Sequence, residues 1–378
     1  LHLLSRRQRQ MCIRDSYNAI IIARENMKIY AYVSIIEVFL KLLIVYLLIV
    51  FSVDKLKLYA VLIFVVTCIV SAIYRFICCR KYKEARFSFY WDRTLFRSVF
   101  SYSSWTLFGT MAGVANNQGT NLILNVFFGP VLNAAYSIAY QVSTVIQQFS
   151  SNFFMAIRPP LIKSYAEKNY DYMMQLFYLS SRFSFLLLYA IILPLILEVE
   201  FILKLWLGTV GEYMVLFTQL VLVYCLILAI SNPITVIMQA AKKVKLYHGV
   251  VDSFVLLTLP LTYLFFKLGY PPESTLIVSI IVLLIAHALR IWVLAQIVPF
   301  SLNDYFKKFV FPAIIVVVLS IIPTLFIQSL FQNELIQFVV VCLMSLLCIL
   351  LCSYYIVLTS EEKQQLISFI LKRNRLND

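Results

Sequence analysis

The sequence predicts an all-α protein that crosses a membrane many times, and three observations support this fold class. Hydrophobic residues make up 62% of the 378 residues, and charged residues make up only 13%. A soluble domain carries about 25% charged residues, so this chain cannot cover a core with polar surface. The mean hydropathy is +0.88, and apolar stretches of about 20 residues, the length that spans a bilayer, recur along the whole chain.

We expect ten spanning helices. Prolines interrupt several of the apolar stretches, and membrane helices tolerate such kinks because neighbouring groups satisfy the freed carbonyls. The predicted spans are residues 33–53, 57–79, 97–127, 131–157, 176–203, 213–237, 250–269, 275–297, 309–331 and 334–358. After the last span, Thr359 and Glu362 stand at the spacing of a capping box, so an interfacial helix is expected in the tail, residues 359–378.

Positive charge alternates between successive loops, and this alternation predicts the orientation of the chain. From Tyr17 onward, one set of loops, together with the segments that flank the first and last spans, carries 21 lysines and arginines. The alternate loops carry only Lys55, Lys57, Lys204 and Lys267. Because cytoplasmic loops are rich in Lys and Arg, the segment before the first span and the C-terminus are both predicted to be cytoplasmic. The loops on the other side are short, so no folded domain is expected there.

Composition excludes several classes of function. The net charge of +14 lies in these loop clusters, so no nucleic-acid partner is expected. The eight cysteines and three histidines show no metal-ligand spacing. No glycine-rich loop precedes a Lys-Ser/Thr pair. We therefore expect no metal, no cofactor and no enzymatic activity.

Two stripes of amide side chains lie in the third and fourth predicted spans. Each stripe follows one face of its helix, because its members recur at helical spacing. The first stripe is Asn117, Asn121 and Asn125, and the second is Gln141, Thr144, Gln148 and Asn152. Two antiparallel helices with such stripes can line a hydrophilic cavity. The same amides can also bind neighbouring helices by hydrogen bonds, and the sequence leaves both interpretations open.

Three cations lie inside predicted spans, where charged groups are costly and usually meet a partner or a wet cavity. Lys41 follows Glu37 by four residues, which also fits an ordinary helical salt bridge. Arg182 lies near the predicted cytoplasmic end of its span and can reach the interface. Arg290 follows His287 by one turn and is the best candidate to bind an anionic headgroup. A structural role stays open for each of the three cations.

Three acidic residues, Glu198, Glu200 and Asp252, lie near predicted helix ends, and we expect solvated side chains there. The only carboxylate well inside a predicted span is Glu37. An interior rich in cations and poor in acids favours an anionic cargo.

The segment NLILNVFFGPVLNAAYSIAYQV, residues 121–142, resembles the Wzx-type O-antigen flippases. These proteins form the polysaccharide-export branch of the multidrug/oligosaccharidyl-lipid/polysaccharide exporter superfamily. The resemblance extends from Tyr17 to the tail. Its motifs are of the kind that pack helices together or line a cavity, and they are not catalytic motifs. The family often has arginine where this chain has Tyr136, which removes a cation from that point. Further similar segments are YNAIIIARENM (17–27), FSFYWDRTLFR (87–97), KSYAEKNYDYM (163–173), LEVEFILKLWL (197–207) and KLGYPPES (267–274).

The resemblance implies a chain of fourteen helices, arranged as two six-helix lobes like those of the MATE drug transporters plus two appended helices. On that layout, residues 17–96 hold the end of the first lobe and a linker, residues 97–297 form the second lobe, and residues 298–358 form the appended pair. Four helices would then precede Tyr17. Residues 1–16 are expected to be a non-native leader, because the composition changes abruptly at Tyr17.

The function implied by the resemblance is the flipping of an undecaprenyl-diphosphate-linked oligosaccharide across the bacterial inner membrane by alternating access. The lipid-linked oligosaccharide, membrane lipid and a coupling ion, sodium or proton, are the expected partners. The alternative is a cation-coupled multidrug antiporter of the same fold.

Overall fold

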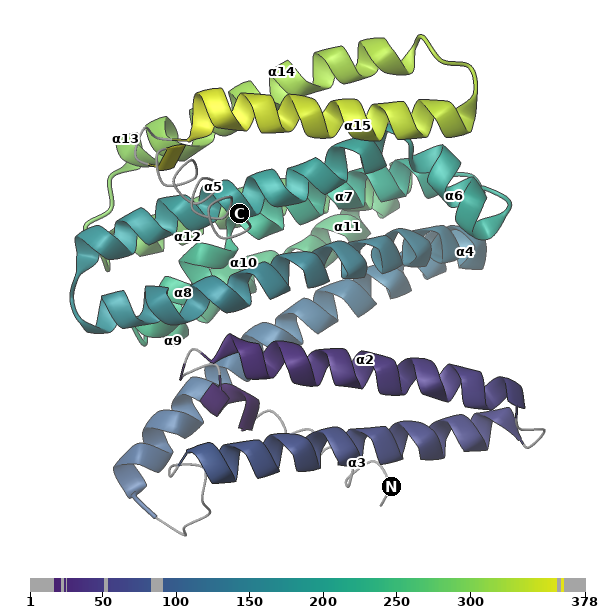
Figure 1. The fold of residues 1–378 in the computed structure, drawn as a ribbon. Helices are drawn as coiled ribbons and strands as arrows, with labels where there is room; N and C mark the ends of the chain where they lie inside the picture. The colour runs from purple at the N-terminus through teal and green to yellow at the C-terminus, as the bar shows by residue number, and fades with distance from the viewer. Residues whose placement is uncertain are drawn as a thin grey trace, which may run out of the picture. The chain divides into compact units, whose positions relative to one another are not determined.

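The computed structural model describes residues 17–21, 24, 26–50, 54–82, 91–358 and 362–363. These residues form helices and turns and no strand, and nine of their helices are long and apolar enough to cross a membrane (Figure 1). The predicted all-α, multi-pass fold class is confirmed. The leader 1–16 and the tail 359–378, apart from Glu362 and Lys363, lie outside the described residues. The chain divides into two units, residues 1–93 and 94–378, and each is described by itself.

The first unit is built on two long helices, α2 (Met27–Val50) and α3 (Lys55–Lys81). They correspond to the predicted spans 33–53 and 57–79. Asp54 begins α3, because its carboxylate accepts hydrogen bonds from the amides of the first turn. The two helices share a small core in which Val70 and Tyr74 are almost completely buried.

The second unit begins with the 74-residue α4 (Arg93–Ala166). An unbroken helix of that length would be about 111 Å long, far more than a bilayer needs. At Gly129 the backbone leaves the helix, with φ 80° and ψ -176°, a conformation open to glycine alone. Residues 93–128 and 130–166 therefore form two arms that fold back at Gly129–Pro130 (Figure 1). These arms are the predicted spans 97–127 and 131–157.

Fourteen further helical elements follow α4 in the described part of the chain, and they include six candidate membrane spans. Their order matches the remaining predicted spans, although several begin earlier in the chain than expected. The elements are α5 (Tyr170–Leu197), α6 (Val199–Leu207), α7 (Met214–Ile230), α8 (Asn232–Ala240), α9 (Val244–Tyr247), the π-helix η2 (His248–Asp252), α10 (Ser253–Val255), α11 (Thr258–Lys267), α12 (Ser274–Ala295), α13 (Leu302–Tyr305), the π-helix η3 (Phe306–Val310), α14 (Phe311–Gln328), α15 (Glu334–Cys352) and the π-helix η4 (Ser353–Val357).

The second arm of α4 runs parallel to α7 and α8 in constant register. Ser143 contacts Cys225 at 3.1 Å, Asn232 donates to the hydroxyl of Ser150 at 3.2 Å, and Arg158 donates to the amide oxygen of Gln239 at 2.7 Å. The sequence separations are 82, 82 and 81 residues. The first arm instead meets η2 and α11, where the ring of Phe128 packs edge-on against Phe266.

Helix α5 is joined to the last two long helices, α14 and α15, at three depths. In the middle, the hydroxyl of Tyr189 lies 2.9 Å from that of Ser320 on α14. At one end Arg182 donates to the carbonyl of Val357 at the end of η4, at 2.9 Å. At the other end the amide of Gln328 donates to the carbonyl of Leu197 at 3.0 Å. Residues 94–378 consequently group as one unit, with the appended pair included.

Glu198 corrects the expectation of a solvated carboxylate. The predicted span 176–203 breaks at this residue, where α5 ends and α6 begins. The Glu198 residue is only 5% exposed. Its Oε1 accepts hydrogen bonds from the side-chain amides of Gln328 at 3.2 Å and Gln337 at 3.1 Å. Two amides from α14 and α15 thus satisfy a carboxylate that the sequence pattern placed in solvent.

The burial of Glu198 predicts a pH-dependent stability. Desolvation raises the pKa of the Glu198 carboxyl above its ordinary value of 4.5, against the opposing effect of the two amide donors. The folded state therefore binds this proton more tightly than the unfolded state, so stability increases as the pH falls through the raised pKa and is lost as the pH rises through it. We expect Glu198→Gln to raise the thermal midpoint of the detergent-solubilised chain at pH 7 and to flatten its pH dependence.

The matched control is Glu200→Gln, which removes the same charge from a carboxylate whose side chain is 64% exposed. In this control variant Glu198 is intact, so the thermal midpoint should still differ between pH 5 and pH 7 as it does in the unsubstituted chain. Equal behaviour of the two variants would show that burial of Glu198 has no thermodynamic effect.

Candidate functional site

Arg290 on α12 is the centre of the candidate site. Only 5% of the residue is exposed, although arginine is rarely buried without a partner. Its Nε donates to the hydroxyl of Tyr247 at 3.1 Å, and its Nη1 donates to the hydroxyl of Ser231 at 3.1 Å. The third nitrogen, Nη2, has no hydrogen bond to any residue that the structure describes. The guanidinium is thus held in place by two neutral hydroxyls.

The two hydroxyls belong to breaks between helices. Ser231 separates α7 from α8, and Pro233, which follows at the start of α8, has no backbone N–H to complete the helix. Tyr247 ends α9 immediately before η2. Short π-helical segments often mark functional positions because one extra residue per turn redirects side chains. The local irregularities direct both hydroxyls at Arg290.

His287, one turn before Arg290, extends the network. Its Nδ1 lies 3.0 Å from the hydroxyl of Ser231, and its Nε2 lies 3.0 Å from the hydroxyl of Tyr305. All these contacts are satisfied when Arg290 donates to Ser231, Ser231 donates to Nδ1, and Nε2–H donates to Tyr305. A neutral imidazole completes this arrangement. The network therefore adds no negative charge.

Arg290 has no carboxylate partner among the described residues, and this decides what the site can bind. An isolated buried cation is costly, because removal from water is not repaid by neutral acceptors alone. An anion that reaches Nη2 would supply the missing counter-charge through a charge-assisted hydrogen bond. The site is therefore chemically suited to a phosphate or a carboxylate.

The first amide stripe is partly internal. The Nδ2 of Asn121 donates to the Oδ1 of Asn117 at 3.4 Å, and the Oδ1 of Asn121 is buried without a hydrogen-bond donor. Asn125 is exposed. Buried amide oxygens without a donor are uncommon, because each costs the free energy of a lost hydrogen bond. This oxygen can accept from a hydroxyl group.

The second stripe lies on the exposed side of its arm. Gln141, Thr144, Gln148 and Asn152 are all exposed, and Gln148 donates to Asn152 at 3.4 Å within the same helix. The hydrogen bonds that join this arm to α7 and α8 come from Ser143, Ser150 and Arg158 instead. No bond between the two stripes is present among the described residues. The stripe is thus not what holds these helices together.

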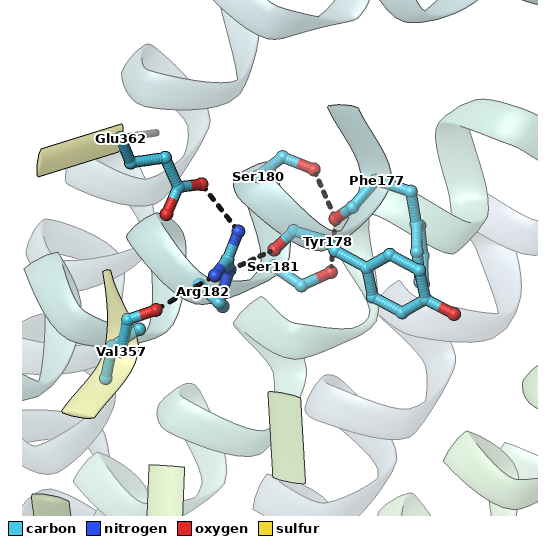
Figure 2. Close-up of polar contacts among 7 residues, drawn as sticks. All are labelled: Phe177, Tyr178, Ser180, Ser181, Arg182, Val357 and Glu362. Atoms are coloured by element: carbon cyan, nitrogen blue, oxygen red, sulfur yellow. Dashed lines mark hydrogen bonds and ion pairs between the residues drawn. The ribbon is translucent and has the colours of Figure 1, made fainter. Parts of the chain in front are cut away.

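The other two predicted cations have carboxylate partners. Lys41 is exposed and forms an ion pair with Glu37 at 2.9 Å, as the helical spacing indicated. Figure 2 shows Arg182 between the carboxylate of Glu362 and the carbonyl of Val357. Neither cation shares a hydrogen-bond partner with Arg290 in the described part of the chain. Within the second unit, Arg182 and Arg290 therefore hold separate sets of partners.

A contact between a buried histidine and a partly buried aspartate corrects the expectation that Asp252 is solvated. The π-helix η2 brings Nδ1 of His248 into contact with Oδ2 of Asp252. His248 is 8% exposed, and the backbone of α4 passes so close that a side chain at Gly109 would collide with both residues. The i,i+4 spacing of the pair was the available signal. Across the described residues, no group of three or more His, Cys, Asp or Glu side chains is placed to hold a metal ion.

The N-terminal part of the chain is similar to a known family. Residues 14–165 match the family model described as Polysaccharide biosynthesis protein. The matched stretch contains α2, α3, the Gly129 turn and both amide stripes, whereas Arg182 and Arg290 lie beyond it. No curated protein and no solved structure matches the chain. The match supports, at the level of the family, the resemblance seen in residues 121–142 and a role in polysaccharide synthesis or export.

Proposed function

We propose that this chain is part of a flippase that moves a diphosphate-linked oligosaccharide, carried on undecaprenol, from the cytoplasmic to the outer leaflet of the bacterial inner membrane. The observation that carries the proposal is the buried Arg290, which lacks a carboxylate partner in the described residues. A lipid diphosphate supplies the anion that this guanidinium lacks. The similarity to polysaccharide biosynthesis proteins supplies the class of cargo.

The position of Arg290 suits the start of such a transfer. It lies five residues before the end of α12, about 8 Å along the helix axis. The sequence predicts that this end faces the cytoplasm, where the lipid-linked sugar is assembled. Diphosphate binding at this depth would draw the headgroup below the interface, before the lobes change their arrangement.

The amide stripes suit the sugar part of the cargo. Sugar hydroxyls donate and accept hydrogen bonds, as amides do, so Asn121 and the exposed Gln141, Gln148 and Asn152 can exchange water for hydroxyls at little cost. This exchange needs no covalent chemistry and no cofactor. Movement then follows from alternating access, with a sodium or proton gradient as the driving force.

A cation-coupled multidrug antiporter is the second candidate, and Glu198 is the observation that favours it. Such transporters use carboxylates buried at membrane depth to bind a cationic drug or a coupling ion. Glu198 is a buried carboxylate, but it lies just beyond the candidate span Tyr170–Leu197, and two amide donors already occupy its Oε1. Expression of a full-length copy in a drug-sensitive strain tests this candidate, since raised resistance that Glu198→Gln abolishes would favour it over the flippase.

Deletion of the gene provides the direct test of the flippase. We expect surface polysaccharide to fall to background and the lipid-linked oligosaccharide to accumulate in the cytoplasmic leaflet, because synthesis continues without translocation. Surface glycan is measured by lectin or antibody staining. The leaflet that holds the lipid-linked oligosaccharide is identified by comparing the accessibility of its sugar in spheroplasts and in inverted vesicles. Normal surface glycan in the deletion strain would reject the proposal.

A further inference from the structure

Arg182, apart from the Arg290 site, contacts an anion, the carboxylate of Glu362 (Figure 2). Its Nε donates to the carbonyl of Tyr178 at 3.4 Å, and its Nη1 donates to the carbonyl of Val357 at 2.9 Å. Its Nη2 donates to Oε1 of Glu362 at 2.6 Å. The guanidinium therefore meets two neutral carbonyls and a single anion.

The neutral partners belong to the helical frame, whereas the anion belongs to the tail. Tyr178 lies on α5, and Val357 ends η4 and is only 7% exposed within the core. Glu362 lies five residues farther along, and 19% of its side chain is exposed. The helical frame thus fixes the position of the guanidinium but leaves its charge unbalanced. The tail supplies the balancing charge.

Two further cations lie over tyrosine rings of the same unit. The Nζ of Lys308 lies 5.3 Å from the centre of the Tyr178 ring, and the Nζ of Lys363 lies 5.3 Å from the centre of the Tyr354 ring. Lys308 also forms an ion pair with Asp304 at 3.0 Å. Among the described residues of this set, three cations thus accompany two carboxylates. The sequence predicts that this end of the unit lies at the cytoplasmic interface, among lipid phosphates.

We propose that Arg182 is a binding site for an anionic phosphate group, and that Glu362 occupies this site as an internal substitute when no phosphate is bound. The guanidinium fork suits carboxylate and phosphate alike, and phosphate offers more acceptor oxygens. Binding of a phosphate-bearing lipid then displaces the carboxylate of Glu362 from Arg182 on α5. The site uses a different guanidinium from Arg290 and requires no transported glycan, so it goes beyond the proposed flippase activity.

The experiment measures binding of phosphatidylglycerol to the purified full chain in detergent, by native mass spectrometry across a lipid titration. Glu362→Gln is expected to increase the affinity severalfold, because it leaves Arg182 without its internal anion. Asp304→Asn is the matched control, since it removes the same charge beside Lys308 at the same end. It should bind the lipid as the unsubstituted chain does. Binding of diacylglycerol, which carries no phosphate, should be the same in all three proteins.

Inorganic phosphate added to the titration identifies the group that is recognised. Competition supports a site for phosphate on any carrier, whereas lack of competition supports a site for the lipid headgroup at the interface. A double variant that combines Arg182→Lys with Glu362→Gln keeps the positive charge at position 182 but removes the guanidinium fork. It should lose the increase in lipid affinity that Glu362→Gln alone produces. Equal lipid affinities of Glu362→Gln and Asp304→Asn would overturn the proposal, because net charge alone would then explain the data.

Discussion

Arg290→Ala is expected to reduce surface glycan by roughly 100-fold, because it removes the only buried cation that the described residues leave without a carboxylate. Charge-assisted hydrogen bonds are worth about 1.5–3 kcal/mol each, and the loss of about 3 kcal/mol of headgroup binding corresponds to that factor. The stability of the protein should change little. Ser231 keeps its contact with His287, and Tyr247 keeps its contact with Thr235 at 2.8 Å.

The measurement compares surface glycan with the amount of protein in the membrane, in a full-length copy that complements the deletion strain. Arg290→Lys should retain part of the activity, because the charge remains while the planar fork is lost. Lys267→Ala removes one positive charge from the loop predicted to face the opposite side and should export normally. Full export by Arg290→Ala at normal membrane level would remove the main support for an anionic cargo at this site.

Gly129→Ala is expected to destabilise the second unit by about 1–3 kcal/mol, the usual cost of holding an L-residue in a sparsely populated backbone conformation. The cause is conformational, since no atom lies within 4 Å of the position that a Cβ would take. A free-energy loss of that size corresponds to a thermal midpoint lower by roughly 2–10 °C for a unit of this length. Fluorescence-detected size-exclusion chromatography after heating gives the midpoint in detergent.

Gly113→Ala is the matched control, because it lies in the first arm of the same helix and also has no atom within 4 Å of the added Cβ. Its backbone is helical, so alanine should leave the stability unchanged or add up to about 1 kcal/mol to the free energy of unfolding. The thermal midpoint should therefore stay the same or rise. Similar midpoints for the two variants would show that the turn at Gly129 does not constrain the unit.

The fold was largely predictable because lipid imposes long apolar segments and helical backbone on any chain that crosses it. Gly129–Pro130 separated two spans correctly, since glycine allows the positive φ and proline starts the next helix. The break at Glu198 was not predictable in the same way. Leu197 and Val199 continue the apolar pattern, and the amides that satisfy Glu198 come from residues 130 and 139 positions later in the chain.

The candidate site was predictable only in its central residue. A cation inside an apolar segment marked Arg290, but its hydroxyl partners Tyr247 and Ser231 lie 43 and 59 residues earlier in the chain. Serine and tyrosine are common in membrane helices, so neither stands out without the tertiary structure. Arg182 and Glu362 are 180 residues apart, and no local pattern connects them. The amide stripes were visible at helical spacing, although the pattern did not show that five of their seven members would be exposed.

The constant register between α4 and the α7–α8 pair limits the kinds of motion open to this unit. A slide of one helical turn, about 5.4 Å, would separate Ser143 from Cys225, Ser150 from Asn232 and Arg158 from Gln239 at the same moment. Shear along this seam is therefore opposed cooperatively, whereas rotation of the joined helices about a common axis breaks none of the three contacts. The three contacts act together as a brace that resists axial displacement of the second arm of α4 against α7 and α8.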